Sequence, residues 1–179
     1  MYISLGLSPL ANNLVKNINK EVDVFPLDVN LCMKCFNSQL SVVVPPQDMF
    51  DEYLYLSSTT ETFRKHFYNL AQKIKNDFKL DVNSKVLDIG SNDGIFLKPL
   101  FEMGINVIGI EPAKNVAKIA KKAGLETIES YFDKKVVSKI LTKFGKVDIV
   151  TAFNVFAHAD DLHEIALNIE KVLKPKGTF

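Results

Sequence analysis

The second half of the sequence alternates short apolar runs with amphipathic segments, and this alternation restricts the fold more than any other feature. The expected strands cover residues 85–89, 106–110, 126–129 and 147–153, and the expected helices cover 95–103, 115–123, 134–144 and 161–173. Apolar runs bounded by turn residues and separated by helical patterns are typical of parallel strands joined by crossover helices. We therefore expect an α/β fold with a parallel sheet covered on both faces.

A further helix is expected before the first of these strands. The stretch "STTE" at residues 58–61 has the pattern of a capping box, in which Ser58 and Glu61 each satisfy the other's end of a helix. The apolar residues that follow share one helical face, namely Phe63, Phe67, Leu70, Ala71, Ile74 and Phe78. Residues 1–57 lack such a stripe and contain scattered prolines and β-like runs. We therefore expect two parts, an irregular or β module at 1–57 and an α/β domain at 58–179.

Charge, hydropathy and cysteine content exclude several classes of protein. The net charge is +1, which gives no reason to expect binding to nucleic acid or to an acidic membrane surface. No apolar run approaches the length needed to cross a bilayer, and the first residues lack the pattern of a secretion signal. The sequence contains two cysteines, Cys32 and Cys35, which is too few for a disulfide scaffold, and we expect a cytoplasmic protein.

The turn after the first expected strand has an unusual composition, "VLDIGSNDGIFL" at residues 86–97. Gly90 and Gly94 allow close approach of the backbone to a ligand, and ligands of open parallel sheets bind beyond the carboxyl ends of the strands. The stretch matches neither the dinucleotide fingerprint nor the P-loop, and Asp88 and Asp93 would repel a pyrophosphate. A cationic or zwitterionic ligand suits the turn better, although turns of this kind also occur for packing alone.

Acidic and polar side chains follow the neighbouring strands. Glu111 ends the second strand, where an acid can accept hydrogen bonds from the hydroxyl groups of a ribose. The combination suits S-adenosylmethionine, which carries a sulfonium, an ammonium and a ribose. The fourth strand leads to Asn154 and His158, and Phe132 follows the third strand, where it would cover an adenine or belong to the core.

Several segments, in order, resemble the sugar C-methyltransferase family. They are "LGLSPLANNL", "FPLDVNLCMKCFNSQLSVVVPPQDMFDEYLYLSSTTETFRKHF", "VLDIGSNDGIFL", "VIGIEPAKNVA" and "FNVFAHADDL". The resemblance covers essentially the whole chain. It implies a Rossmann-like class I methyltransferase sheet after a small zinc-binding module, and an enzyme that methylates keto-deoxysugars carried on a nucleoside diphosphate with S-adenosylmethionine.

The resemblance also implies a set of site residues. The cofactor-binding set is Asp88, Gly90, Asn92, Asp93, Gly94, Glu111, Pro112, Phe132 and Asn154. A base would remove the proton next to the sugar ketone, and donors would stabilise the resulting oxyanion. The catalytic candidates are Tyr53, Tyr55 and His158. The family has a catalytic tyrosine in this segment, but the sequence does not decide between the two, and both rings or the histidine could instead serve packing.

One departure from the family concerns zinc. The family module has two C-x-x-C pairs, and this sequence contains only the pair Cys32 and Cys35. Four thiolates complete a tetrahedral structural site, and two do not. We therefore expect zinc to bind weakly, or with ligands supplied from elsewhere.

The other departure concerns the end of the sequence. It stops at "VLKPKGTF", where the fifth strand of the family should begin, so we expect an incomplete sheet of strands one to four. The exposed edge would favour pairing with a second chain. The resemblance implies that the family's base, a His–Glu pair, would lie in the missing region. Residues 1–179 alone should then catalyse no methyl transfer. The alternative to an enzyme is a non-catalytic fragment or binding module derived from one.

Overall fold

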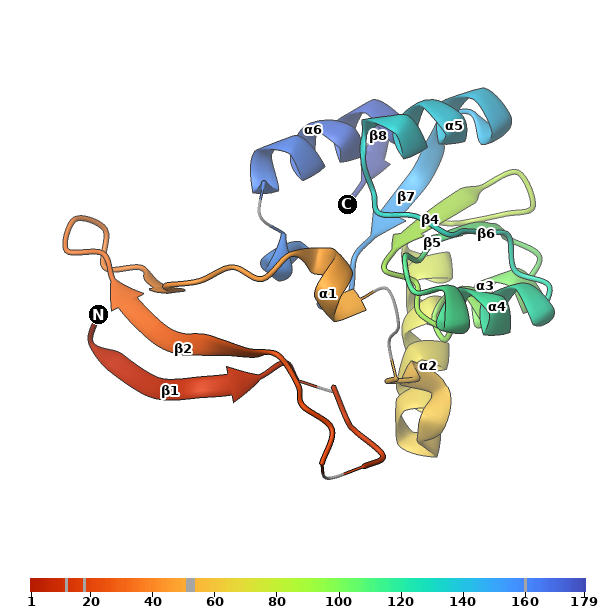
Figure 1. Ribbon diagram of the computed structural model, residues 1–179. Coiled ribbons are helices and arrows are strands. Elements are labelled where there is room, and N and C mark those ends of the chain that lie inside the picture. The colour runs from red at the N-terminus through yellow and green to blue at the C-terminus, as the bar shows by residue number, and fades with distance from the viewer. Residues whose placement is uncertain (12, 18, 51–53, 160) are drawn as a thin grey trace. The chain divides into compact units, whose positions relative to one another are not determined.

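The computed structural model describes residues 1–11, 13–17, 19–50, 54–159 and 161–179. The chain divides into two units, Met1–Tyr55 and Leu56–Phe179. In the first unit, strand β1 (Ile3–Pro9) pairs antiparallel with β2 (Val24–Leu31), and β2 pairs with β3 (Ser38–Leu40) (Figure 1). A short helix, α1 (Pro46–Phe50), follows. The irregular or β-like character expected for this region therefore takes the form of a small antiparallel sheet.

The second unit contains a parallel sheet of five strands in the order β6-β5-β4-β7-β8. The strands are β4 (Lys85–Ile89), β5 (Asn106–Ile110), β6 (Thr127–Ile128), β7 (Val147–Thr151) and β8 (Leu173–Thr178). The helices are α2 (Glu61–Asp77), α3 (Leu97–Glu102), α4 (Lys114–Lys122), α5 (Lys134–Phe144) and α6 (Leu162–Val172), with single 3₁₀ turns at η1 (Ser57–Thr59) and η2 (Phe156–His158). The strand order reverses beside β4, which confirms the Rossmann-like α/β class expected from the sequence.

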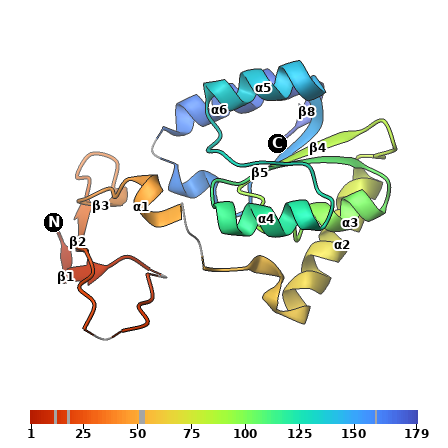
Figure 2. The same cartoon turned by 45° about the vertical axis from the view of Figure 1, so that its right-hand side comes forward.

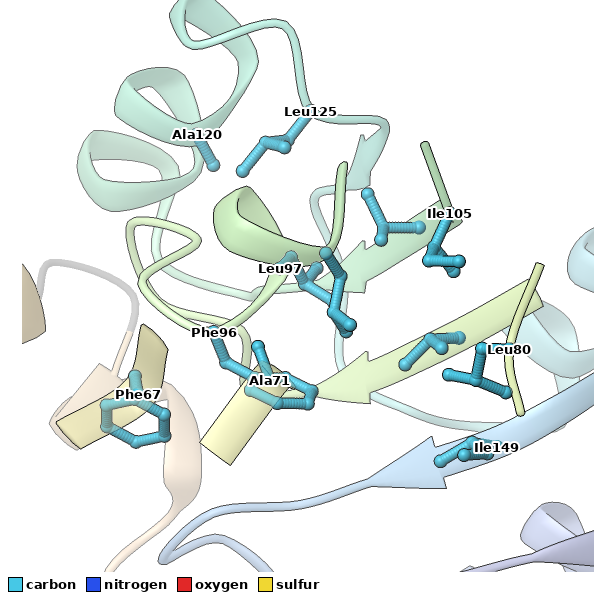
Figure 3. Close-up of a cluster of buried hydrophobic side chains, with 12 residues drawn as sticks. Phe67, Ala71, Leu80, Phe96, Leu97, Ile105, Ala120, Leu125 and Ile149 are labelled. Atoms are coloured by element: carbon cyan, nitrogen blue, oxygen red, sulfur yellow. The ribbon is translucent and has the colours of Figure 1, made fainter. Parts of the chain in front are cut away.

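Helices cover both faces of this sheet, with α2, α3 and α4 on one side and α5 and α6 on the other (Figure 2). Successive residues of a strand point to opposite faces. Val86 accordingly joins the apolar cluster of the first side, shown in Figure 3, and Leu87 joins the cluster of the second side. Among the described residues, no helix combines the length and the apolar content that a bilayer span requires.

The sheet has one strand more than the four that we expected. Residues Leu173–Thr178 form β8, which runs parallel to β7, with Leu173 opposite Val147 and Thr178 opposite Ile149. The run Lys-Pro-Lys-Gly has little strand character, but an edge strand tolerates proline because one side of it makes no ladder bonds. A second chain that covers this edge stays a prediction.

The helix boundaries correct one detail and agree with a second, since Pro99 in the expected helix 95–103 indicates a kink or a late start. Thr60, and not Ser58, caps α2, because its side chain accepts from the N–H of Phe63 at 3.3 Å. Pro99 lies inside α3, which begins late, at Leu97, so that the proline falls in the first turn where its missing N–H costs nothing.

We predict that Leu87→Ala destabilises the second unit by about 2–5 kcal/mol, because it leaves a cavity in the central strand of the sheet. Leu87 is 0% exposed, whereas Val82, which is 69% exposed, provides the control substitution Val82→Ala. Urea denaturation measures both. Equal unfolding free energies for the two variants would contradict the central position of Leu87.

Candidate functional site

The carboxyl end of β5 lies against the turn of residues 90–94 that follows β4. Glu111 is 6% exposed, and its carboxylate accepts from the N–H of Asn92 at 2.8 Å and from the N–H of Ala113 at 2.9 Å. Each carboxylate oxygen has a second lone pair that these bonds leave open. The structure therefore brings together the acid and the glycine turn that the sequence suggested as parts of one ligand site.

The two glycines of the turn are required by the backbone and by packing. Gly90 has φ +69°, and a Cβ there would lie 2.4 Å from Cγ2 of Val155. Gly94 has φ +84°, and a Cβ there would lie 2.2 Å from Cδ1 of Leu125. Both contacts are far shorter than two carbon atoms allow. Packing alone would thus explain both glycines, and the case for a ligand rests on the charged groups around them.

Three carboxyl groups are buried around this turn, those of Asp88, Asp93 and Glu111. Burial raises the pKa of Asp88 to about 7; a hydrogen bond from the Thr151 hydroxyl at 2.7 Å opposes the rise, and the charge of Glu111 adds to it. Burial likewise raises the pKa of Glu111, against the lowering effect of its two backbone donors. No ion pair recorded among the described residues involves any of the three. A cationic ligand would relieve this unbalanced negative charge.

Two buried polar atoms of the turn have no hydrogen-bond partner in the described structure. They are Oδ1 of Asp93 and the hydroxyl oxygen of Ser91. A buried acceptor without a donor carries a desolvation cost that a ligand N–H or O–H can remove. The free carboxylate oxygen of Asp93 therefore fits a ligand that carries an ammonium group.

One side-chain oxygen of Asn92 and one of Asp93 contact the segment that leads into α2. The side-chain oxygen of Asn92 accepts from the N–H of Ser57 at 2.9 Å, and Oδ2 of Asp93 accepts from the N–H of Ser58 at 3.0 Å. The sequence suggested these side chains for cofactor binding alone. Ser57 and Ser58 were not anticipated in the site, because nothing in their residue type marks a backbone amide as a donor to a distant turn.

The remaining candidates on the donor side lie at the carboxyl edge of the sheet. Asn154 is exposed and left-handed, with φ +55°, shortly after β7, and Pro112 is half-buried next to Glu111. Phe132 is half-buried and packs against the apolar cluster under α5 and α6.

Thr151 and Val155 also contact the site, and the sequence did not predict them. A hydroxyl at a strand end and a valine in a loop gave no signal of their contacts with Asp88 and Gly90.

The catalytic candidates are less completely placed. His158 is exposed at the end of η2, after β7. Tyr55 is exposed and ends the first unit. Tyr53 lies outside the described residues. The structure therefore places the expected cofactor-binding residues near the carboxyl ends of β4, β5, β6 and β7, while their roles, and those of His158 and the two tyrosines, stay predictions.

Cys32 and Cys35 lie in the hairpin between β2 and β3. The N–H of Cys32 donates to the carbonyl of Asn37 at 2.9 Å, and the N–H of Phe36 donates to the carbonyl of Cys32 at 2.8 Å, with Phe36 at φ +60°. The backbone N–H groups of Cys35 and Lys34 point to the sulfur of Cys32 and lower its pKa, which favours the thiolate that a metal requires. Within the described ranges, no three His, Cys, Asp or Glu residues gather around a common point. The pair thus fits half of a tetrahedral zinc site.

Comparison with known proteins finds two family models that match different parts of the chain. A family model described as "Methyltransferase domain" matches residues 62–179, and one described as "Putative zinc binding domain" matches residues 1–50. The C-methyltransferase NovU of Streptomyces niveus is 32% identical over 99% of this chain and 43% of its own length. The chain therefore spans less than half of that relative.

Other similar proteins match part of the chain. A ubiquinone biosynthesis O-methyltransferase of Bartonella bacilliformis is 29% identical over 52% of this chain and 38% of its own length. The crystal structure of a "putative s-adenosyl-l-methionine-dependent methyltransferase" from Methanococcus maripaludis has a TM-score of 0.54 and 17% identity, over 66% of this chain and 56% of that one. At that identity the likeness shows the fold. The family model covers most of the chain and the whole of the described sheet, and the chain therefore belongs to the methyltransferase domain family.

Proposed function

We propose that this chain binds S-adenosylmethionine at the carboxyl ends of β4 and β5. The observation that carries the proposal is the group of three buried carboxyls, Asp88, Asp93 and Glu111, which make no ion pair with any residue that the structure describes. Glu111 would accept from the ribose hydroxyls through its open lone pairs, and Asp93 would accept from the ammonium through its unpartnered Oδ1. When bound, the cofactor supplies a methyl group on a positively charged sulfur.

We infer further that the reaction is C-methylation of a nucleoside-diphosphate keto-deoxysugar. The similarity to the C-methyltransferase extends over 99% of this chain and so includes the first unit, whereas the O-methyltransferase shares 52% of it. The identity of the sugar rests on the motif resemblance described above.

The substrate-side roles follow the same resemblance. We assign to His158, and to a tyrosine of the segment that holds Tyr53 and Tyr55, the role of donating hydrogen bonds to the sugar ketone and to the oxyanion that develops from it. His158 suits the assignment because it follows β7, and the carboxyl ends of parallel strands meet at one edge of a sheet. An imidazole N–H can donate a hydrogen bond to a ketone oxygen.

The donor site is tested with Glu111→Gln. The variant keeps one acceptor oxygen but loses the charge and the second acceptor, so we expect binding of S-adenosylhomocysteine to weaken by about 1–3 kcal/mol. Isothermal titration measures the change, with Glu126→Gln as the control, because Glu126 is exposed and pairs with Lys143. If Glu111→Gln binds as tightly as the parent, the ribose does not lie at Glu111.

The raised pKa of Asp88, about 7, predicts a pH dependence of binding. Below that pH the carboxyl is neutral, and above it the carboxylate attracts a cation. We therefore expect the affinity for S-adenosylmethionine to rise relative to that for S-adenosylhomocysteine as pH increases through 7, since both ligands share the amino group and only the first carries the sulfonium charge. Titrations at several pH values measure the ratio. Asp88→Asn should flatten it, and a persistent slope in that variant would assign the effect to another group.

The reaction is tested with radiolabelled S-adenosylmethionine and two acceptors, a nucleoside-diphosphate keto-deoxysugar for C-methylation and a phenol for O-methylation. When this chain is joined to the family's region that carries the base, we expect label on a carbon of the sugar. We also expect a large loss of turnover in His158→Ala, on the order of 10²-fold for a group that transfers or donates a proton. Label on the phenol would replace the proposed acceptor. Donor binding without transfer to either acceptor would favour a binding module.

A further inference from the structure

The glycine turn makes two side-chain contacts with the backbone of residues 57–58. Asn92 and Asp93 are 9% and 7% exposed, and each accepts from one amide, that of Ser57 at 2.9 Å and that of Ser58 at 3.0 Å. These contacts join positions 35 residues apart in the sequence. Two consecutive amides held by two consecutive side chains form a specific docking point for this segment.

The segment is also fixed from the side of α2. A guanidinium nitrogen of Arg64 donates to the carbonyl of Ser58 at 2.6 Å, and the hydroxyl of Thr59 donates to the carbonyl of Leu56 at 3.1 Å. The peptide groups around Ser58 are therefore held at both their N–H and their C=O. Of these contacts, only those from the turn connect the segment to the proposed donor site.

Asn92 links the segment to the acid of that site. Its N–H donates to Oε2 of Glu111 at 2.8 Å, while its side-chain oxygen accepts from Ser57. The residue has φ +51°, a left-handed conformation that presents the N–H and the side chain of one residue to these two partners. A ligand that binds Glu111 is thus connected to Ser57 through a single residue, Asn92.

Asp93 makes the second link. Its Oδ2 holds the amide of Ser58, and its Oδ1 has no partner in the described structure. A donor group that fills Oδ1 would fix the plane of the carboxylate and with it the bond from Ser58. One carboxylate can in this way bind a ligand and hold the chain segment at the same time.

We propose that Asn92 and Asp93 are positioning residues that anchor residues 57–58 to the glycine turn, so that occupation of the donor site orders this segment. The proposal rests on the proposed donor site for its ligand-dependent part. The anchored residues begin two positions after Tyr55, so the anchor lies next to the end of the segment to which the substrate-side tyrosine was assigned. Binding of the donor would then precede productive binding of the sugar.

Hydrogen exchange at the amides of Ser57 and Ser58 tests the anchor. Asn92→Gly removes the side-chain acceptor but keeps the left-handed backbone and the N–H that faces Glu111. In the free protein we expect the Ser57 amide to exchange about fivefold faster or more in this variant, the factor that loss of a net hydrogen bond gives. Lys79→Gly is the matched control, because Lys79 is also left-handed, at φ +52°, after α2. Equal exchange at Ser57 in parent and Asn92→Gly would overturn the anchor.

Saturating S-adenosylhomocysteine tests the ligand-dependent part. In the parent we expect the ligand to slow hydrogen exchange at both amides. In Asn92→Gly, at equal ligand occupancy, we expect the ligand to leave exchange at the Ser57 amide unchanged. Asp93→Ala should lose protection at Ser58, and Asp93→Asn should restore it in the free protein, because an amide oxygen still accepts. If the ligand binds without slowing either amide, the coupling is wrong and the proposed function stands. If the ligand does not bind, the donor site and the coupling both fail, while the exchange of the free variants still decides the anchor.

Discussion

The carboxylate of Glu111 joins the elements on which the site depends. Its two oxygens accept from the backbone of Asn92, in the turn after β4, and of Ala113, at the start of α4. One buried acid therefore fixes a loop and a helix start at the carboxyl edge of the sheet. Bonds from N–H groups to a charged acceptor are stronger than neutral ones, and burial raises the cost of losing either donor. The same acid is the proposed ribose acceptor, so the fold and the ligand site share a single group.

Packing and ligand binding make the same demand on Gly90 and Gly94. Both have positive φ, and a methyl group on either would overlap a neighbouring side chain, Val155 or Leu125. A residue pattern reports only that glycine is present, so it could not separate these two causes. The electrostatic surroundings favour a ligand, because three buried carboxyls that make no ion pair within the described residues cost folding free energy, although each also makes structural hydrogen bonds. Asp88, with a pKa raised to about 7, keeps that cost low by holding its proton over much of the acidic range.

The helices and strands of the second unit could be predicted from the sequence where a strong local signal, such as a capping residue or a terminating glycine, marks their ends. The expected helix 134–144 coincides with α5, since Asp133 caps it and Gly145 ends it. The strand at Leu173–Thr178 escaped prediction because its edge position tolerates proline and glycine, which suppress the usual signal. Ser58 was expected to cap α2 but has its amide bound to Asp93. That contact is tertiary, and no local pattern encodes it. The acids and glycines of the site were predictable because strand ends converge, whereas the amides that face them were not.

The first unit presents a different physical problem. Among its described residues none is buried, and Leu5, Leu7 and Phe36 are 68%, 68% and 70% exposed. A sheet of this size without a core has little hydrophobic free energy to offset the entropy of ordering its chain. Domains that cannot build a core are held by metals, disulfides or partner surfaces. The hairpin of Cys32 and Cys35 offers two metal ligands with backbone support, and the apolar side chains of β1 offer a surface that another chain segment can cover. The order of this unit therefore has to be supplied by contacts beyond its own three strands.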